Sequence, residues 1–288
     1  MKFGFLPRSL DIAAGDFTIT TIADWRTAVA EIEAQGHVAK GWLFKPSRHD
    51  GPQPVGRFQL PITHEVLSAS DNDPERMRFV VLVLGFLLGL RLLPEGWGHL
   101  HGTAVECGKC NGFLIADSEI IPCLELAAAF FASNRQNRNV KRIQSAISLI
   151  QWSKGQEHYF DSFNYLYMAI DACWAVCADA HAAAVASIAK SGRVPHVLRP
   201  QVMQQILGLQ LPAIFDPNAQ VNAASIRNDL IHEGLVGDMP LGLSVMPHCE
   251  HEMREFADKL ILALLGVKAG YIGTAGGDRQ RHALDLKP

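Results

Sequence analysis

The pattern of hydrophobic and polar positions changes character near Asn134, about half-way along the chain. Before Asn134, short segments of different type alternate. The β-branched residues of 17–22 predict a strand, and the helical periodicity of 24–35 predicts an amphipathic helix. A second strand is predicted over 41–44. This alternation is typical of an α+β domain.

Asp73-Pro74-Glu75 predicts the start of a helix, with an acid at the N-cap, proline in the first position and an acid in the first turn. The apolar helix that follows is expected to run to about Leu93. Its uncharged stretch 79–90 is shorter than the roughly 18 residues that a membrane span requires, so it predicts a buried core helix. Farther on, the stretch 103–116 predicts a β-hairpin around a Gly-rich turn at 107–112.

After Asn134 the periodicity is helical almost throughout. Five helices are predicted, over 140–152, 159–180, 201–209, 219–235 and 249–267. The last residues, from Gly273, are polar and rich in glycine, and they predict a loose tail. We therefore expect an α+β N-terminal domain over 1–133, an all-α helical bundle over 134–270 and a flexible tail over 271–288.

Composition narrows the class of protein. With 48% hydrophobic and 19% charged residues among 288, the chain has ample apolar surface to bury, which excludes disorder as its main state. The net charge of −3 and the pI near 6.4 exclude a protein that holds nucleic acid by bulk positive charge, although a local basic patch remains open. The six irregularly spaced cysteines predict reduced thiols, and the first residues do not resemble a secretory signal. We expect a cytoplasmic protein that is not embedded in a membrane.

The residues 225–234 combine a cation, an amide and an imidazole on one predicted helix. Asn228 and His232 are one turn apart and share a face. Arg227 lies about 140° around the helix from His232, but its long side chain can swing toward the imidazole near the helix end. These three polar groups therefore lie on the polar side of a helix whose other face is apolar.

Those residue types suit phosphate chemistry. A guanidinium binds phosphate oxygens through paired, charge-assisted hydrogen bonds, and a histidine can take or give a proton near neutral pH. Attack of an RNA 2′-hydroxyl on the adjacent phosphate requires proton removal and stabilisation of the charged transition state. The spacing alone also fits a plainer structure, in which Arg227 pairs with Asp229 or Glu233 and His232 interacts with the helix dipole.

The sequence Arg-Asn-Asp-Leu-Ile-His-Glu-Gly over 227–234 resembles the R-x(4–6)-H signature of the HEPN superfamily. In that signature Asn, Asp or His commonly follows the arginine, and a small residue often follows the histidine. The predicted helix over 163–174 also resembles the early helix of the family, which carries an apolar run that ends in an acid. The resemblance extends from about 134 to 270 and does not include the first half of the chain.

The resemblance implies a small helical bundle that forms a homodimer and cleaves RNA without a metal or other cofactor. Many such endoribonucleases belong to toxin–antitoxin or antiviral defence systems, so an antitoxin or a sensor partner is expected. By resemblance Arg227 binds the scissile phosphate, His232 is the acid and base, and Asn228 orients them. Some family members lack the motif and bind RNA, nucleotides or proteins without cutting. A non-catalytic binding module is therefore the alternative.

Asp171 is the next candidate for the catalytic site. It lies just outside the apolar stripe of the predicted helix 159–180. An acid at the edge of a buried face often pairs with a cation, and Arg227 is the expected one. The family offers a precedent for an acid at this place, whereas a solvated acid or a salt bridge to another helix is the alternative.

Cys107-Gly-Lys-Cys110 has the form of one half of a zinc knuckle, because a C-x2-C spacing suits tetrahedral zinc. Two further ligands are required, and His99, His101 and Cys123 are the nearest candidates. The alternative is a hairpin that carries two packed or exposed thiols. If the zinc were structural and the 227–234 motif a chance match, the protein would not be a nuclease.

Two basic segments are candidates for contact with RNA. The denser one is expected to form a stripe along a helix: Arg135, Arg138, Lys141 and Arg142. The looser one precedes the third of the predicted C-terminal helices: Lys190, Arg193 and Arg199. If RNA binds at the motif helix, one of these segments should flank it, whereas a solvated surface is the alternative for either.

Overall fold

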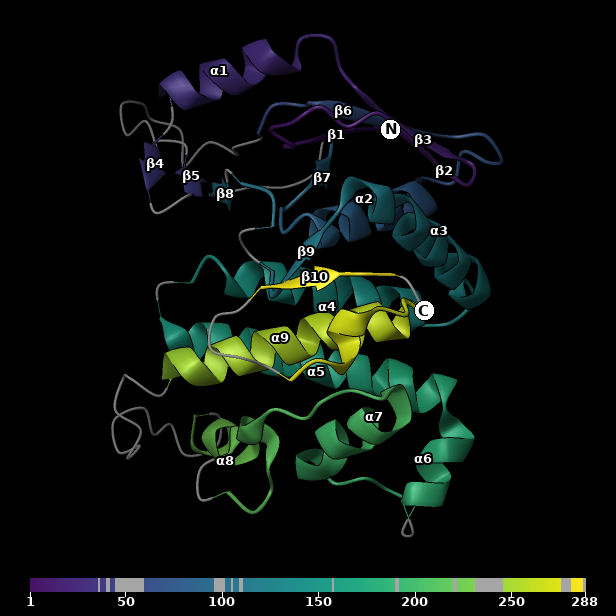
Figure 1. Cartoon of the computed structure of the whole chain (residues 1–288), viewed down its shortest axis with the longest axis vertical. Helices are drawn as coiled ribbons and strands as arrows, with labels where there is room; N and C mark the ends of the chain where they lie inside the picture. The colour runs from purple at the N-terminus through teal and green to yellow at the C-terminus, as the bar shows by residue number, and fades with distance from the viewer. Residues whose placement is uncertain are drawn as a thin grey trace, which may run out of the picture. The chain divides into compact units, whose positions relative to one another are not determined.

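The computed structural model describes residues 1–35, 37–39, 42–44, 60–95, 102–104, 106–108, 111–156, 158–189, 192–219, 222–230, 246–275 and 281–286. The chain forms two compact units (Figure 1). The first comprises Met1–Cys110 and Ile115–Ala132, and the second comprises Asn111–Leu114 and Ser133–Pro288. The first combines sheets with helices, and the second is mostly helical.

The first unit is built on a five-stranded antiparallel sheet with the strand order β2-β3-β6-β1-β7. Its strands are β1 (Lys2–Gly4), β2 (Ile12–Ala14), β3 (Phe17–Thr21), β6 (His64–Ser68) and β7 (Leu93–Pro94). A second sheet has the order β4-β5-β8, from β4 (His37–Ala39), β5 (Trp42–Phe44) and β8 (Gly102–Ala104). The helices that begin in this unit are α1 (Trp25–Gln35), α2 (Pro74–Leu87) and α3 (Asp117–Asn134).

Helix α2 begins where the sequence predicts, because the Asp73 side chain caps it by accepting a hydrogen bond from the Glu75 amide. Its apolar face is buried, and Phe79 packs against Phe131 of α3 with ring centroids 5.7 Å apart. The predicted extension to Leu93 is wrong. Gly89 adopts a left-handed φ of 65° and the Leu90 amide bonds back to Gly85, a Schellman-type ending that stops the helix although the apolar residues continue.

The hairpin predicted over 103–116 is also wrong. Strand β8 pairs with β5 in the first unit, whereas β9 (Phe113–Ile115) pairs with β10 (His282–Leu284), near the C-terminus. The two strands therefore belong to different sheets. Both β8 and β9 pair with strands that are distant in the sequence. The turn-like composition between β8 and β9 does not indicate those partners.

The second unit is a helical bundle whose central pair is α5 (Tyr159–Ala180) and α9 (Met246–Leu264) (Figure 1). Apolar side chains of both helices are fully buried, among them Leu166 and Phe256. The bounds of α5 are those predicted, and α4, α7 and α9 begin and end within about three residues of their predicted bounds. The remaining helices and turns are α4 (Asn139–Ser153), α6 (Ala182–Ile188), η1 (His196–Leu198), α7 (Arg199–Leu207), η2 (Ala213–Phe215), α8 (Ala223–Asn228) and η4 (Gly270–Gly273).

The segment predicted as a loose tail is structured where the structure describes it. Tyr271 in η4 is almost fully buried, β10 pairs with β9, and Leu284 has no exposed surface. Such residues pack through tertiary contacts that polar, Gly-rich composition does not signal. Within the described chain no single helix has the length and apolar character to cross a membrane, although α5 and α6, bent by 101° at their junction, reach that threshold when taken together.

Candidate functional site

Helix α8 carries Arg227 and begins at a capping box. The Asn222 side chain accepts hydrogen bonds from the amides of Ala224 and Ser225, and the Ser225 hydroxyl accepts one from the Asn222 amide. This cap places the start of the helix four residues later than predicted. Ile226 then faces the core and Arg227 remains half-buried on the adjacent face.

The guanidinium of Arg227 lies over the ring of Tyr167 on α5, 5.8 Å from its centroid. Its Nη1 also donates a long hydrogen bond of 3.4 Å to Oδ1 of Asn228, which is exposed. Two of the predicted site residues are thus in contact, and Arg227 is directed toward α5. The third residue of the motif, His232, lies outside the described residues.

Asp171 lies one turn beyond Tyr167 on α5, and its partner differs from the predicted one. Nη1 of Arg199, at the start of α7, donates to Oδ1 of Asp171 at 2.8 Å. Nδ1 of His196, in η1, is 3.8 Å from the same oxygen. The prediction that Arg227 holds Asp171 is wrong, and the alternative, a salt bridge to another helix, is confirmed. The turn from η1 into α7 brings Arg199 against the carboxylate.

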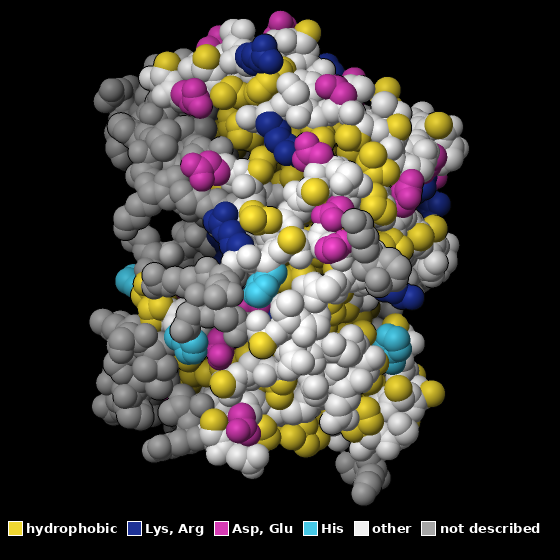
Figure 2. All heavy atoms as spheres, viewed as in Figure 1, with side chains coloured by type: hydrophobic (Ala, Val, Ile, Leu, Met, Phe, Trp, Pro, Cys, Tyr) yellow, Lys and Arg dark blue, Asp and Glu magenta, His cyan; other side chains and the backbone are white. Residues whose placement is uncertain are grey.

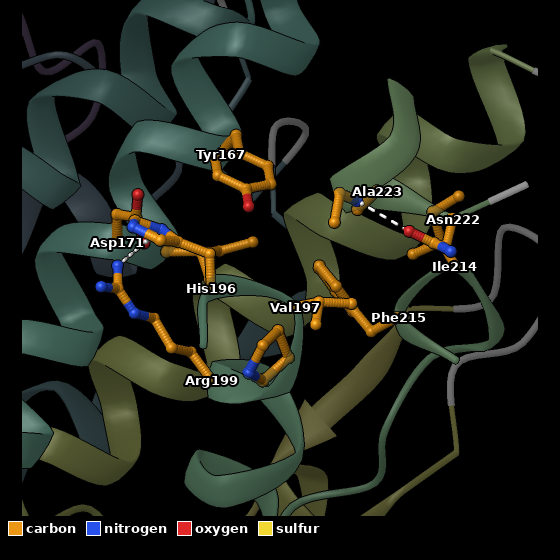
Figure 3. A pocket seen from close by; sticks show the side chains of 12 residues that line it. Tyr167, Asp171, His196, Val197, Arg199, Ile214, Phe215, Asn222 and Ala223 are labelled. Atoms are coloured by element: carbon orange, nitrogen blue, oxygen red, sulfur yellow. Dashed lines mark hydrogen bonds and ion pairs between the residues drawn. The ribbon is translucent and has the colours of Figure 1, made fainter. Parts of the chain in front are cut away.

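These side chains line a pocket between α5, η1, α7, η2 and α8 (Figure 3). Tyr167, Asp171, His196 and Arg199 form its polar side, and Phe215 and other apolar residues lie opposite. The pocket has a volume of about 340 Å³, part of which is open solvent. A group presented from solvent can therefore reach the polar side chains of the pocket.

The charges around the pocket shift the proton equilibria of two of its groups. Burial and the nearby Arg199 lower the pKa of His196, and Arg227 and Arg193 act in the same direction while Asp171 opposes them. Burial raises the pKa of Tyr167, and the Asp171 carboxylate adds to this rise. At neutral pH His196 is therefore a neutral imidazole that can accept a proton, and Tyr167 is a neutral phenol.

The denser basic segment does not form the predicted stripe along one helix. Arg138 precedes α4, and only Lys141 and Arg142 lie on the helix itself. Arg138 and Lys141 are exposed, whereas Arg142 forms an ion pair with Asp179 of α5 and donates to Oδ1 of Asn139 at 2.9 Å. Arg142 thus bridges α4 and α5. On the face drawn in Figure 2, the described Lys and Arg side chains are scattered singly among acidic ones.

The looser basic segment is the one that flanks the motif helix. Arg199 lines the same pocket as Ala223 and Ala224 of α8, and Arg193 lies close enough to His196 to lower its pKa. The third residue of this segment, Lys190, lies outside the described residues. Arg193, Arg199 and Arg227 are therefore all close enough to the pocket to act on His196.

Of the predicted zinc ligands, Cys107 is half-buried and Cys110 lies outside the described residues. Burial raises the pKa of the Cys107 thiol, which favours the neutral thiol over the thiolate that binds zinc. Cys123 is buried within α3, and burial raises its pKa to about 12. Among the described residues no three His, Cys, Asp or Glu side chains come together around a metal position, so the zinc site stays a prediction.

Sequence reasoning did not assign Tyr167 and His196 to the site. Tyr167 falls within the apolar stripe of α5, and its hydroxyl gave no separate signal. His196 stands between proline and two apolar residues in a short turn, where no periodicity marks it. Arg199 was recognised only as part of a basic loop. One signal could have indicated the site: Arg193, His196 and Arg199 lie within seven residues of one another.

Comparison with known proteins supplies no relative from which a function could be carried over: no family model, curated protein or solved structure matches the chain. The chemistry of the pocket therefore follows from its own residues. A half-buried guanidinium can bind an anion, a neutral imidazole can take a proton, and a carboxylate can stabilise the imidazolium that results. The set can serve reactions at a phosphodiester.

Proposed function

We propose that the protein is a metal-independent endoribonuclease of the HEPN type. The observation that carries the proposal is the position of Arg227, the first residue of the RNDLIHEG motif. Its guanidinium lies over Tyr167, which lines a pocket together with His196, Asp171 and Arg199. The resemblance of the motif to the HEPN signature supports the same function.

The proposed reaction is attack of an RNA 2′-hydroxyl on the adjacent phosphate. Arg227 binds the non-bridging phosphate oxygens and stabilises the charge that develops on them. His232, five residues farther along the chain, transfers a proton, and Asn228 orients the Arg227 guanidinium to which it is hydrogen-bonded. The products are a 2′,3′-cyclic phosphate and a free 5′-hydroxyl. No step needs a metal ion, since protons move between side chains and the substrate.

The setting that fits this activity is a cytoplasmic homodimer in a toxin or antiviral defence system. In that setting the first unit senses a trigger or binds an antitoxin or another restraining partner. Arg138 and Lys141, both exposed, extend the contact with RNA beyond the pocket. Arg142 holds α5 through Asp179 and contributes mainly to the bundle.

A non-catalytic binding module is the second candidate. The observation that favours it is that Arg227 over Tyr167, together with the Asp171–Arg199 pair, already makes a surface that can hold a phosphate or a nucleotide base. Binding there does not require any proton transfer. The two candidates differ in whether bound RNA is cut.

The test is an RNA cleavage assay in EDTA with the parent chain, Arg227→Ala and His232→Ala. We expect the parent to cut RNA and both variants to lose the activity. Arg26→Ala, at an exposed arginine of the first unit, and His158→Ala, at an exposed histidine of the second, are the matched controls and should remain active.

Cleavage by His232→Ala at the parental rate would contradict the proposed HEPN-type mechanism, in which His232 transfers a proton. An RNA that the parent binds but never cuts would establish the binding module instead. End-group analysis adds an independent check, because the proposed attack leaves a cyclic phosphate.

A further inference from the structure

The pocket contains a proton-accepting group, His196, that is not part of the RNDLIHEG motif. His196 lines the pocket from η1, and about half of its side chain is exposed. Its Nδ1 faces the Asp171 carboxylate, which Arg199 holds in place through a 2.8 Å hydrogen bond. A cation, an acid and an imidazole are thus arranged in that order, from Arg199 through Asp171 to His196, with the imidazole next to open solvent.

We propose that His196 is the general base of the reaction and takes the proton from the attacking 2′-hydroxyl, while Asp171 and Arg199 are positioning residues. The inference rests on the proposed nuclease activity. It assigns the base to a side chain outside the RNDLIHEG motif, and it leaves His232 as the acid. Each chain then carries both a base and an acid.

The geometry supports an acid–imidazole pair. An Asp171 oxygen that accepts from Nδ1–H would fix the tautomer of His196, so that Nε2 keeps the lone pair with which a base acts. The separation of 3.8 Å is longer than a hydrogen bond. Catalytic hydrogen bonds are often long without substrate and tighten when it binds. Arg199 prevents Asp171 from turning away, because it holds the same oxygen.

The charges that face His196 favour its neutral form, which acts as a base, over the protonated form, which acts as an acid. They come from every element packed around it: Tyr167 and Asp171 of α5, Arg193 in the preceding loop, Arg199 of α7 and Arg227 of α8. The three arginines and burial lower the pKa of the imidazole, so it is neutral before the reaction. Asp171 is the one carboxylate among these groups, and it stabilises the imidazolium once the proton has arrived.

The proton and bond balance is complete. The 2′-oxygen gives its proton to His196 as its bond to phosphorus forms. The bond between phosphorus and the 5′-oxygen breaks, and that oxygen receives a proton from His232. The two imidazoles end in opposite protonation states from those in which they began, and exchange of protons with water restores them.

The experiment measures RNA cleavage, its pH dependence and binding of an uncleavable 2′-O-methyl RNA for the parent and His196→Gln. Glutamine retains a hydrogen-bonding amide but cannot carry the proton. We expect kcat to fall about 10²- to 10⁴-fold, while binding of the 2′-O-methyl RNA stays within about twofold of the parent. His181→Gln, at an exposed histidine at the end of α5, is the matched control and should cleave at the parental rate.

The pH profile separates a positioning role for Asp171 from a purely structural one. In the parent, activity falls at acid pH as His196 becomes protonated, and His196→Gln should lack this limb. Asp171→Asn removes the group that raises the pKa of His196, so the acidic limb should move to lower pH. A thermal unfolding curve for each variant confirms that the bundle is folded.

The outcomes distinguish this inference from the function on which it rests. If the parent cleaves RNA and His196→Gln cleaves it equally fast, the assignment of the base is overturned and the nuclease stands. If His196→Gln loses RNA binding as well as cleavage, His196 is a binding residue and the assignment is again overturned. If the parent cleaves no RNA, the nuclease itself is overturned, and the base assignment with it.

Discussion

The second unit holds two clusters of charged side chains that differ in their access to water. In the pocket, the side chains of Asp171 and His196 are 35% and 49% exposed. On α9, the side chains of Glu255 and Lys259 are each 3% exposed, and Asp258 is completely buried. Each cluster pairs a carboxylate with a cation, and the two clusters differ in how far water can reach that pair.

The buried cluster joins α9 to the strand and turn beside it. Nζ of Lys259 donates to Oε1 of Glu255 at 2.6 Å and to the Thr274 carbonyl at 2.7 Å. The Gly112 amide donates to Oδ2 of Asp258 at 3.3 Å. Residues from three distant parts of the sequence are thereby tied together. A substrate in solvent cannot reach these groups, so their role is to stabilise the fold.

Several atoms of the buried cluster lack a hydrogen-bond partner among the described residues, including Oδ1 of Asp258 and the hydroxyl of Tyr271. Burial raises the pKa of both groups, since it disfavours their charged forms. In the pocket, solvent can complete the hydrogen bonds of the exposed groups. We therefore expect substitutions on α9 to change the free energy of unfolding and substitutions in the pocket to change the activity.

The largest effect is expected for Lys259→Met. It removes the ammonium and leaves the Glu255 carboxylate buried beside an apolar side chain. Loss of one partner of a buried ion pair costs about 3–5 kcal/mol of unfolding free energy. Urea unfolding followed by circular dichroism, which reports mainly on the helical unit, measures the change.

The control for Lys259→Met is the double variant with Glu255→Met, which removes both charges and should recover much of the loss. If the unfolding free energy of Lys259→Met were within about 1 kcal/mol of the parental value, water would have to reach this ion pair. The contrast between the two clusters would then disappear.

Gly112→Ala tests how closely the strand approaches α9. A Cβ at Gly112 would lie 2.7 Å from the Tyr271 hydroxyl and 3.4 Å from Cγ of Glu255. Because the Tyr271 ring is buried, we expect a loss of about 1–3 kcal/mol in unfolding free energy. In a Tyr271→Phe background, which removes the clashing oxygen, the same substitution should cost clearly less. An equal cost in both backgrounds would contradict this account.

The sequence predicted the parts of the molecule that local rules determine. The capping acid at Asp73 and the unbroken periodicity of 159–180 each correspond to an observed helix boundary. The change of pattern near Asn134 is close to Ser133, where the main part of the second unit begins, although Asn111–Leu114 also belong to that unit. In each case the signal lies within one or two turns of the feature that it predicts.

Features that depend on distant partners could not be predicted in this way. The pairing of β9 with β10 joins residues about 170 positions apart. In the pocket, Asp171 was correctly expected to pair with a cation, but Arg199 and not Arg227 is that cation. The buried cluster gave no signal, because charged residues at 255, 258 and 259 in a sequence suggest an exposed face.

The pH dependence of the unfolding free energy of Asp258→Asn tests whether the carboxylate in the buried cluster is shielded from water. Since the folded-state pKa of Asp258 is raised, its favourable contribution is complete below the ordinary aspartate pKa and is lost as pH rises through the folded pKa. Asparagine does not titrate. The stability of Asp258→Asn relative to the parent should therefore increase with pH across that window, by at most about 1.4 kcal/mol per pH unit. A difference independent of pH would contradict burial of the carboxylate as the cause.

The smallest change in stability is expected for Asp171→Asn in the pocket. Its ion pair with Arg199 is partly open to water, so its loss should lower the unfolding free energy by less than about 1 kcal/mol. RNA cleavage should nevertheless fall at least about tenfold, because a neutral amide in place of the carboxylate would no longer stabilise the imidazolium of His196. Urea unfolding and initial cleavage rates on one preparation measure both quantities. If Asp171→Asn destabilised the bundle as much as Lys259→Met, the ion pair in the pocket would be structural, and exposure would not separate the two clusters.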